Sequence, residues 1–193
     1  MGIGVPAQHR RPAHSNFRIL GLGVGAPFEE IAAKLGHVTD VQRGDAATGR
    51  DQICYVSPAG DIHLIFEFGE VEGVFYLFEN GPKWKGDNFC ARSMKVDKSL
   101  STASGLRLGM NPAQVEKILG KPSTIAKDKL IYDFEFRKKT PPQDLKKFRE
   151  SDPEMSDQEF RKNYEFSDVR DYIEAHFTHS KLSYLAIANT DTF

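Results

Sequence analysis

An α+β fold made of two tandem units, each a short helix followed by antiparallel strands, is the structure that this sequence predicts. The first observation is an internal repeat, because residues 21–36 fall on residues 105–120 when the chain is shifted by 84 positions. The second is a short helical pattern inside each copy, and the third is the alternation of apolar and polar residues after it. A repeat of this kind indicates that one supersecondary unit is used twice.

Glycines and leucines carry the repeat. The identical positions include Gly21, Gly25, Leu35 and Gly36 in the first copy and Gly105, Gly109, Leu119 and Gly120 in the second, where Pro122 follows. The repeat predicts a first unit at 17–96, a linker at 97–104 and a second unit at 105–193.

Each copy contains the pattern of a helix of about two turns. In the second copy Asn111 is a good N-cap, Pro112 fills the first helical position and Gly120 ends the helix. In the first copy an apolar stripe with helical spacing is formed by Phe28, Ile31, Ala32 and Leu35. Each helix therefore has one apolar face that another element must cover.

The segments after each helix have the alternation typical of half-buried antiparallel strands. We expect strands at 52–57, 62–68, 73–78 and 89–96 in the first unit, and at 130–136, 172–178 and 182–188 in the second. The turn between the last two is predicted at His179, Ser180 and Lys181.

A charged insertion at 138–169 interrupts the strands of the second unit. Pro141 and Pro142 introduce a predicted helix at 143–150, and Ser156 with Glu159 forms the capping box of another. We interpret the insertion as a solvated elaboration, and a partner-binding arm is the alternative.

Composition limits the possible partners. The 193 residues are 39% hydrophobic and 27% charged with a formal net charge of −1, so the chain has no long-range attraction for nucleic acid. No apolar run approaches the roughly 18 residues of a membrane-spanning helix.

The two cysteines and the N-terminal residues bear on localisation. Cys54 and Cys90 are either a disulfide, which would indicate a periplasmic or secreted protein, or two buried reduced thiols. Residues 1–16 are polar and predict a disordered tail or the remnant of a signal peptide, since Val5-Pro6-Ala7 has the small-residue character of a cleavage site. The cytoplasm is the alternative location.

The second copy of the repeat carries a resemblance to a bacterial family. Residues 105–115, closing with Leu119-Gly120-Lys121-Pro122, resemble the repeat of the β-lactamase-inhibitor-protein-like fold that the SmpA/OmlA (BamE) lipoproteins share. The first copy departs from the pattern at Ala26 and Val38. The resemblance implies helices packed on one face of a continuous curved sheet whose other face is open. It also implies an exported protein that binds other proteins or assists assembly.

Three motifs suggest chemistry, and each has a simpler interpretation. Gly21, Gly23 and Ala26 satisfy the dinucleotide pattern G-x-G-x-x-A, but the second copy keeps the register with Arg107 in place of Gly23, so we expect turns and no cofactor. His176 and His179 would point to opposite faces of a strand, so we expect no metal.

Paired carboxylates are the third motif. Asp133 and Glu135 share one face of a predicted strand, with Glu174 as a third member. A hydrolase would need these groups desolvated and oriented, so an enzyme is the weaker prediction.

The sequence therefore predicts a non-catalytic, exported protein-binding module that uses an open sheet face and its flanking loops. A carrier of a small ligand is the alternative, and the oligomeric state is not predicted. The candidate contact residues combine aromatic and acidic or imidazole groups, the composition of binding hot spots: Trp84, Tyr76, Phe75, Tyr184, Glu135, Glu174 and His176.

Overall fold

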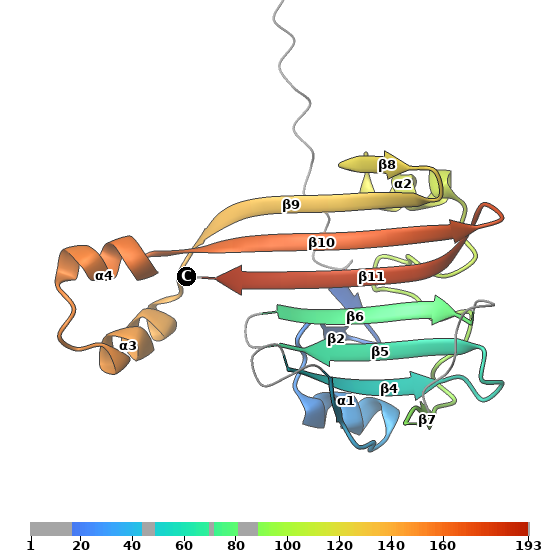
Figure 1. Ribbon diagram of the computed structural model, residues 1–193, viewed down its shortest axis with the longest axis horizontal. Coiled ribbons are helices and arrows are strands. Elements are labelled where there is room, and N and C mark those ends of the chain that lie inside the picture. Colours follow the sequence, from blue (N-terminus) through green and yellow to red (C-terminus); the bar gives the residue numbers. More distant parts are fainter. Residues whose placement is uncertain (1–16, 44–48, 70–71, 81–88, 193) are drawn as a thin grey trace, which may run out of the picture.

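One large antiparallel sheet organises the chain (Figure 1). The computed structural model describes residues 17–43, 49–69, 72–80 and 89–192, and these form an α+β structure with four helices. In chain order the elements are β1 (Arg18–Ile19), β2 (Leu22–Gly23), α1 (Phe28–Leu35), β3 (Val41–Arg43), β4 (Arg50–Val56), β5 (Ile62–Phe68), β6 (Glu72–Glu79), β7 (Ala91–Arg92), α2 (Pro112–Leu119), β8 (Thr124–Ala126), β9 (Lys129–Lys139), α3 (Pro142–Ser151), α4 (Asp157–Tyr164), β10 (Phe166–Thr178) and β11 (Lys181–Thr192).

The strand order of the nine-stranded sheet joins the two halves of the chain. Along the sheet the order is β3-β4-β5-β6-β11-β10-β9-β8, and β7 pairs in parallel with β4. The junction is the antiparallel pair β6–β11, in which Tyr76 lies opposite Ala186. Strands β9, β10 and β11 run past the ends of β4, β5 and β6, and α3 and α4 lie beyond that projecting end (Figure 1).

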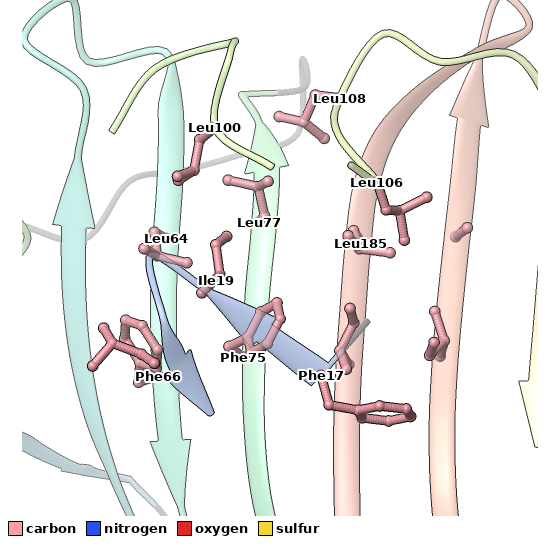
Figure 2. Packing of buried hydrophobic residues seen from close by; sticks show 14 of the residues in the cluster. Phe17, Ile19, Leu64, Phe66, Phe75, Leu77, Leu100, Leu106, Leu108 and Leu185 are labelled. Atoms are coloured by element: carbon pink, nitrogen blue, oxygen red, sulfur yellow. The ribbon is translucent and has the colours of Figure 1, made fainter. Parts of the chain in front are cut away.

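Alternate strand residues build the core. Figure 2 shows Ile19 of β1 close to Phe75 and Leu77 of β6, and Phe17 beside β11, the strand that carries Leu185. Leu100, Leu106 and Leu108 lie over the same face. Helices α1 and α2 contribute the buried pairs Ile31 with Leu35 and Val115 with Leu119 to the same cluster. The face of the sheet that contributes to this cluster is called the core face below.

The segment at 97–104 is packed against this core. Leu100 and Thr102 are buried, and Thr102 forms an isolated β-bridge with Ile19. The predicted linker is therefore bound to the core through backbone and side-chain contacts.

Equivalent glycines in the two halves adopt equivalent conformations. All six have positive φ, a region that glycine occupies at no steric cost: Gly21 (78°) and Gly105 (89°), Gly25 (75°) and Gly109 (81°), and Gly36 (100°) and Gly120 (85°). Helices α1 and α2 each have eight residues.

A tyrosine from the sheet holds the C-terminal end of each of these helices. The hydroxyl of Tyr55 donates to the carbonyl oxygen of Gly36 at 2.6 Å, and that of Tyr132 donates to the carbonyl oxygen of Gly120 at 3.3 Å. The N-terminal ends differ, because Asn111 and Gln114 form a capping box while Pro27 gives no side-chain cap.

The boundaries of the insertion differ from the prediction. Strand β9 continues to Lys139 and β10 begins at Phe166, so charged residues predicted to lie outside the sheet extend it. They do so because charged side chains can alternate on exposed strands and pair across them, as Arg137 does with Asp168 at 3.2 Å. The predicted helices are present as α3 and α4, and the Ser156 side chain accepts from the amide of Glu159.

Two further differences concern short strands. The predicted strand at 89–96 is reduced to β7, two residues long and parallel to β4. The turn between β10 and β11 lies at His179 and Ser180, both with positive φ, as a two-residue hairpin turn requires. Among the described residues, no helix combines the length and apolar character needed to cross a membrane.

Gly73 on β6 provides a test of how closely the segment that follows β2 approaches the sheet. A Cβ atom at Gly73 would lie 2.6 Å from the backbone nitrogen of Gly25, so an alanine would force backbone apart. We expect Gly73→Ala to lower the free energy of unfolding by about 1–3 kcal/mol in urea denaturation. Gly23→Ala is the matched control, because no heavy atom lies within 4 Å of its Cβ position, and it should change stability by less than about 0.5 kcal/mol.

Candidate binding face

The face of the sheet opposite the core face carries most of the predicted contact residues. We call it the outer face, and its side chains alternate with the core residues on six consecutive strands. The hydrogen-bonded registers place on it Cys54, His63, Ile65, Glu67, Tyr76, Phe78, Tyr184, Ala186, Tyr172, Glu174, His176, Lys129, Asp133 and Glu135.

A row of rings crosses four strands of the outer face. His63 on β5 stacks on Phe78 of β6 with ring centroids 5.0 Å apart. Phe78 lies 6.1 Å from Tyr184 of β11, and Tyr184 meets His176 of β10 edge to face at 4.9 Å. Tyr76 adds a further ring 6.2 Å from Tyr184. His63, Phe78, Tyr184 and His176 are directly opposite one another in the strand registers, so the backbone of the sheet fixes their row, and Tyr76 lies diagonal to Tyr184.

Glu174 lies beside this row and is bound by three donors. Its carboxylate accepts from Lys129 Nζ at 2.9 Å and from the Tyr172 hydroxyl at 3.2 Å, and it lies 2.8 Å from His176 Nε2. Burial alone would raise the pKa of Glu174, but the hydrogen bonds from Lys129 and His176 outweigh it and hold that pKa below its ordinary value. Glu174 is therefore ionised at neutral pH.

Asp133 forms the second polar cluster of the outer face. Arg170 on β10 donates to both of its carboxylate oxygens, at 2.8 and 2.7 Å, and these hydrogen bonds lower the pKa of Asp133. Glu135 lies 3.9 Å from the same guanidinium and its side chain is 79% exposed. Neither Asp133 nor Glu174 has the raised pKa that a general acid needs.

Near the first edge of the sheet a carboxylate on the outer face is buried. Glu67 is 6% exposed and accepts from Arg50 Nη1 at 2.6 Å and from the side-chain amide of Gln52. The two donors compensate for the loss of water around this charge.

Cys54 and Cys90 form a disulfide, the first of the two predicted alternatives. Cys54 points from β4 to the outer face, where it belongs to a small cluster with Ile65 and Phe78. Phe89 and Cys90 pack against that cluster. The bridge therefore attaches the segment that leads into β7 to the outer face.

The structure separates the predicted contact residues into two groups. Tyr76, Tyr184, Glu135, Glu174 and His176 all lie on the outer face. Phe75 is completely buried in the core, so it is withdrawn as a contact residue: it neighbours Tyr76 on β6, and adjacent strand residues point to opposite faces. Trp84 lies outside the described residues.

The outer face also carries residues that were not among the candidates, including His63, Phe78, Lys129, Arg170 and Tyr172. The sequence contains the alternation that places each of them on one side of its strand. It does not contain the strand order, which decides that His63 and His176 lie in one row.

Two depressions lie on the outer face. One of about 480 Å³ adjoins the ring row and is lined by Phe78, Asn80, Asp128, His176, Phe177 and Tyr184 among others. The other, of about 560 Å³, lies on the projecting parts of β9, β10 and β11. It is lined mainly by Glu135, Arg137, Asp168, Arg170, Thr190 and Thr192.

The remaining motifs have structural roles. Gly21 turns the hairpin between β1 and β2, whereas a dinucleotide site needs a glycine-rich turn leading from a strand into the helix of a parallel β-α-β unit. His179 lies in a turn and His176 on the outer face. In the part of the chain that the structure describes, no group of three or more His, Cys, Asp or Glu residues is arranged to hold a metal ion.

Comparison with known proteins adds no family. No protein-family model matches the chain, and no curated protein and no solved structure matches it significantly. The functional argument therefore depends on the geometry of the outer face.

The Glu174 cluster generates a pH-dependent stability. A carboxyl whose folded-state pKa is lowered stabilises the protein above its unfolded-state pKa, and this contribution is lost as pH falls through the folded-state value. We expect Glu174→Gln to lower the free energy of unfolding by about 1–2 kcal/mol at pH 7, because it breaks charge-assisted hydrogen bonds.

The difference between Glu174→Gln and the unsubstituted protein should shrink as pH falls below about 4. Urea denaturation at several pH values measures it. Glu135→Gln is the matched control, since its exposed side chain has no such contacts. A pH-independent difference would contradict an ionised Glu174.

The disulfide predicts a sensitivity to reductant. Cys54 and Cys90 are 36 residues apart, and opening a loop of that size lowers stability by about 3–4 kcal/mol. We expect dithiothreitol to shift the urea midpoint by a corresponding amount. The double variant Cys54→Ala, Cys90→Ala should have the lower midpoint already and should not respond to reductant.

Proposed function

We propose that this chain is a non-catalytic, exported protein-binding module whose contact surface is the outer face of the sheet. The observation that carries the proposal is the part of the ring row that is only half-buried, Tyr76, Tyr184 and His176, beside the ionised Glu174 cluster. The other two rings, His63 and Phe78, are buried and support it from below. Aromatic groups surrounded by polar ones are the composition of binding hot spots.

The rigidity of this surface favours binding. The ring row is held by four adjacent strands, and three donors restrain the carboxylate of Glu174. Such a surface loses little conformational entropy on binding, so more of the contact energy is available as affinity. Burial raises the pKa of Tyr184, and nearby Tyr76 and Glu174 raise it further, so its hydroxyl stays neutral.

We further infer that the two halves of the chain are copies of one unit, with helices on one face of the sheet and the outer face left for a partner. The matched positive-φ glycines and the Tyr–Gly contacts at the ends of α1 and α2 support this inference. The resemblance to the β-lactamase-inhibitor-protein-like and SmpA/OmlA repeat leads to the same class of function.

Export is supported by the disulfide, because such bonds persist in oxidising compartments and are rare in the cytosol. A periplasmic or secreted location also agrees with the protein-binding role. A small-ligand carrier is the second candidate, favoured by the depression beside Phe78 and Tyr184. Its lining includes Glu79, Asp128, Glu174 and His176, which is more polar than most ligand pockets.

Site-specific crosslinking tests the proposal. A photoreactive amino acid at Tyr76 should give a discrete adduct with one protein of the envelope or secreted fraction of the producing cells. The same amino acid at Glu30, exposed on α1, is the control and should give none. A small molecule that co-purifies with the chain, with no adduct at Tyr76, would favour the carrier instead.

Once the partner is identified, Tyr76→Ala and His176→Ala should each weaken the complex by about 1–2 kcal/mol, or roughly 5- to 30-fold in Kd, because each removes a ring from the contact surface. Isothermal titration calorimetry measures this loss. Glu30→Ala should leave the affinity unchanged, and equal losses in all three variants would indicate a general effect on folding.

A further inference from the structure

The outer edge of β9 is a strand edge that is only partly paired. Among the described residues, β10 pairs with β9 along its whole length, whereas β8 pairs with it only over Lys129–Ile131. On the side of β9 away from β10, Figure 1 shows β8 beside one end and no labelled strand beside the other. Unpaired strand edges are templates for another strand.

The hydrogen bonds of Ser123 identify which residues of β9 face this edge. Its amide donates to the carbonyl oxygen of Ile131 at 2.8 Å, and its hydroxyl bonds both the amide and the carbonyl of Asp133, at 3.0 and 3.1 Å. Backbone groups alternate sides along a strand, so the next residues whose amide and carbonyl point outward are Glu135 and Arg137.

Charge usually protects a strand edge, and here it also selects a partner. Arg137, Lys138 and Lys139 would repel many approaching strands. A second copy of β9, placed antiparallel with the twofold axis at Phe136, puts Glu135 of each copy opposite Arg137 of the other. Glu135 and Arg137 both face the edge, so this register also aligns their backbone donors and acceptors.

Neighbouring registers are disfavoured. A shift of two residues in one direction places Glu135 opposite its own copy, and a shift in the other direction does the same for Arg137. Like charges directly opposite each other destabilise a strand pair. The sequence of this edge is therefore self-complementary in one register, as an isologous twofold interface requires.

The neighbouring strand supports the same register. Glu135 lies opposite Arg170 of β10, and Arg137 lies opposite Asp168. In the dimer a row of four charged residues would cross the paired edges. It would run from Arg170 and Glu135 of one copy to Arg137 and Asp168 of the second copy. Positive and negative groups alternate along this row. The two inner residues, Glu135 and Arg137, therefore each have an opposite charge on both sides.

We propose that two copies of this chain associate through the outer edges of β9, forming one continuous sheet across a twofold axis at Phe136. The proposal does not depend on what binds the ring row, since Glu135 and Arg137 lie toward the projecting end of the outer face, away from that row. The interface is small, so we expect a weak dimer with a Kd of about tens of micromolar.

Charge reversal provides the test. Sedimentation velocity of the full chain over about 5–500 μM should detect a monomer–dimer equilibrium that weakens with added salt. Glu135→Lys and Arg137→Glu each place like charges opposite each other twice in the symmetric dimer. Each variant alone should associate at least about tenfold more weakly.

Mixing the two variants in equal amounts should restore the dimer, because both contacts between positions 135 and 137 of opposite copies then join a base and an acid. Glu150→Lys, which makes the same charge change on exposed α3, is the matched control and should dimerise as the unsubstituted chain does. Circular dichroism checks that each variant is folded. A monomer at all concentrations, unaffected variants, or a mixture that stays monomeric would each overturn the proposal.

Discussion

The pairing of β6 with β11 is the constraint on which the rest of the structure depends. Among the described residues it is the only pairing of two strands that joins the two halves, and it converts two separate sets of strands into one sheet. Because antiparallel pairing fixes which residues lie opposite each other, this junction aligns Phe78 with Tyr184 and thereby continues the ring row from one half into the other. A slip of one residue here would exchange the two faces of every strand in one half relative to the other.

Alternation then gives the sheet two different faces. On the core face, Leu64, Phe75 and Ile187 remove apolar surface from water together with both helices and the 97–104 segment. On the outer face, the same strands carry rings and ionised groups. Strand β5 marks the transition, since Ile62 to Glu67 are buried on both sides, and the small cluster at the disulfide covers its outer side.

The features that can be predicted from the sequence are those that depend on interactions between residues close together in the chain. Helices α1 and α2 were predicted because capping residues, glycine stops and apolar spacing are local signals. The alternation of apolar and polar residues in the long strands is also a local signal. It implies that the neighbours Phe75 and Tyr76 point to opposite faces of the sheet. The β6–β11 junction, the cluster of Lys129 with Glu174, and the parallel pairing of β7 depend on contacts between distant segments, which no local pattern specifies. The ends of β9 and β10 were missed because charged residues in exposed strands resemble those of loops.

The charged residues of the outer face fall into two groups, one near the ring row and one toward the projecting end of the sheet. Near the ring row, Glu174 is hydrogen-bonded within the chain by Lys129 and His176, so the proposed partner would meet a fixed and ionised group. Toward the projecting end, Glu135 is exposed and only weakly paired with Arg170, so its charge remains available to another strand. In the proposed dimer the two ring rows would belong to one continuous surface. A partner with two sites of matching spacing would then gain avidity without any new contact, so weak self-association through β9 would strengthen binding through the outer face.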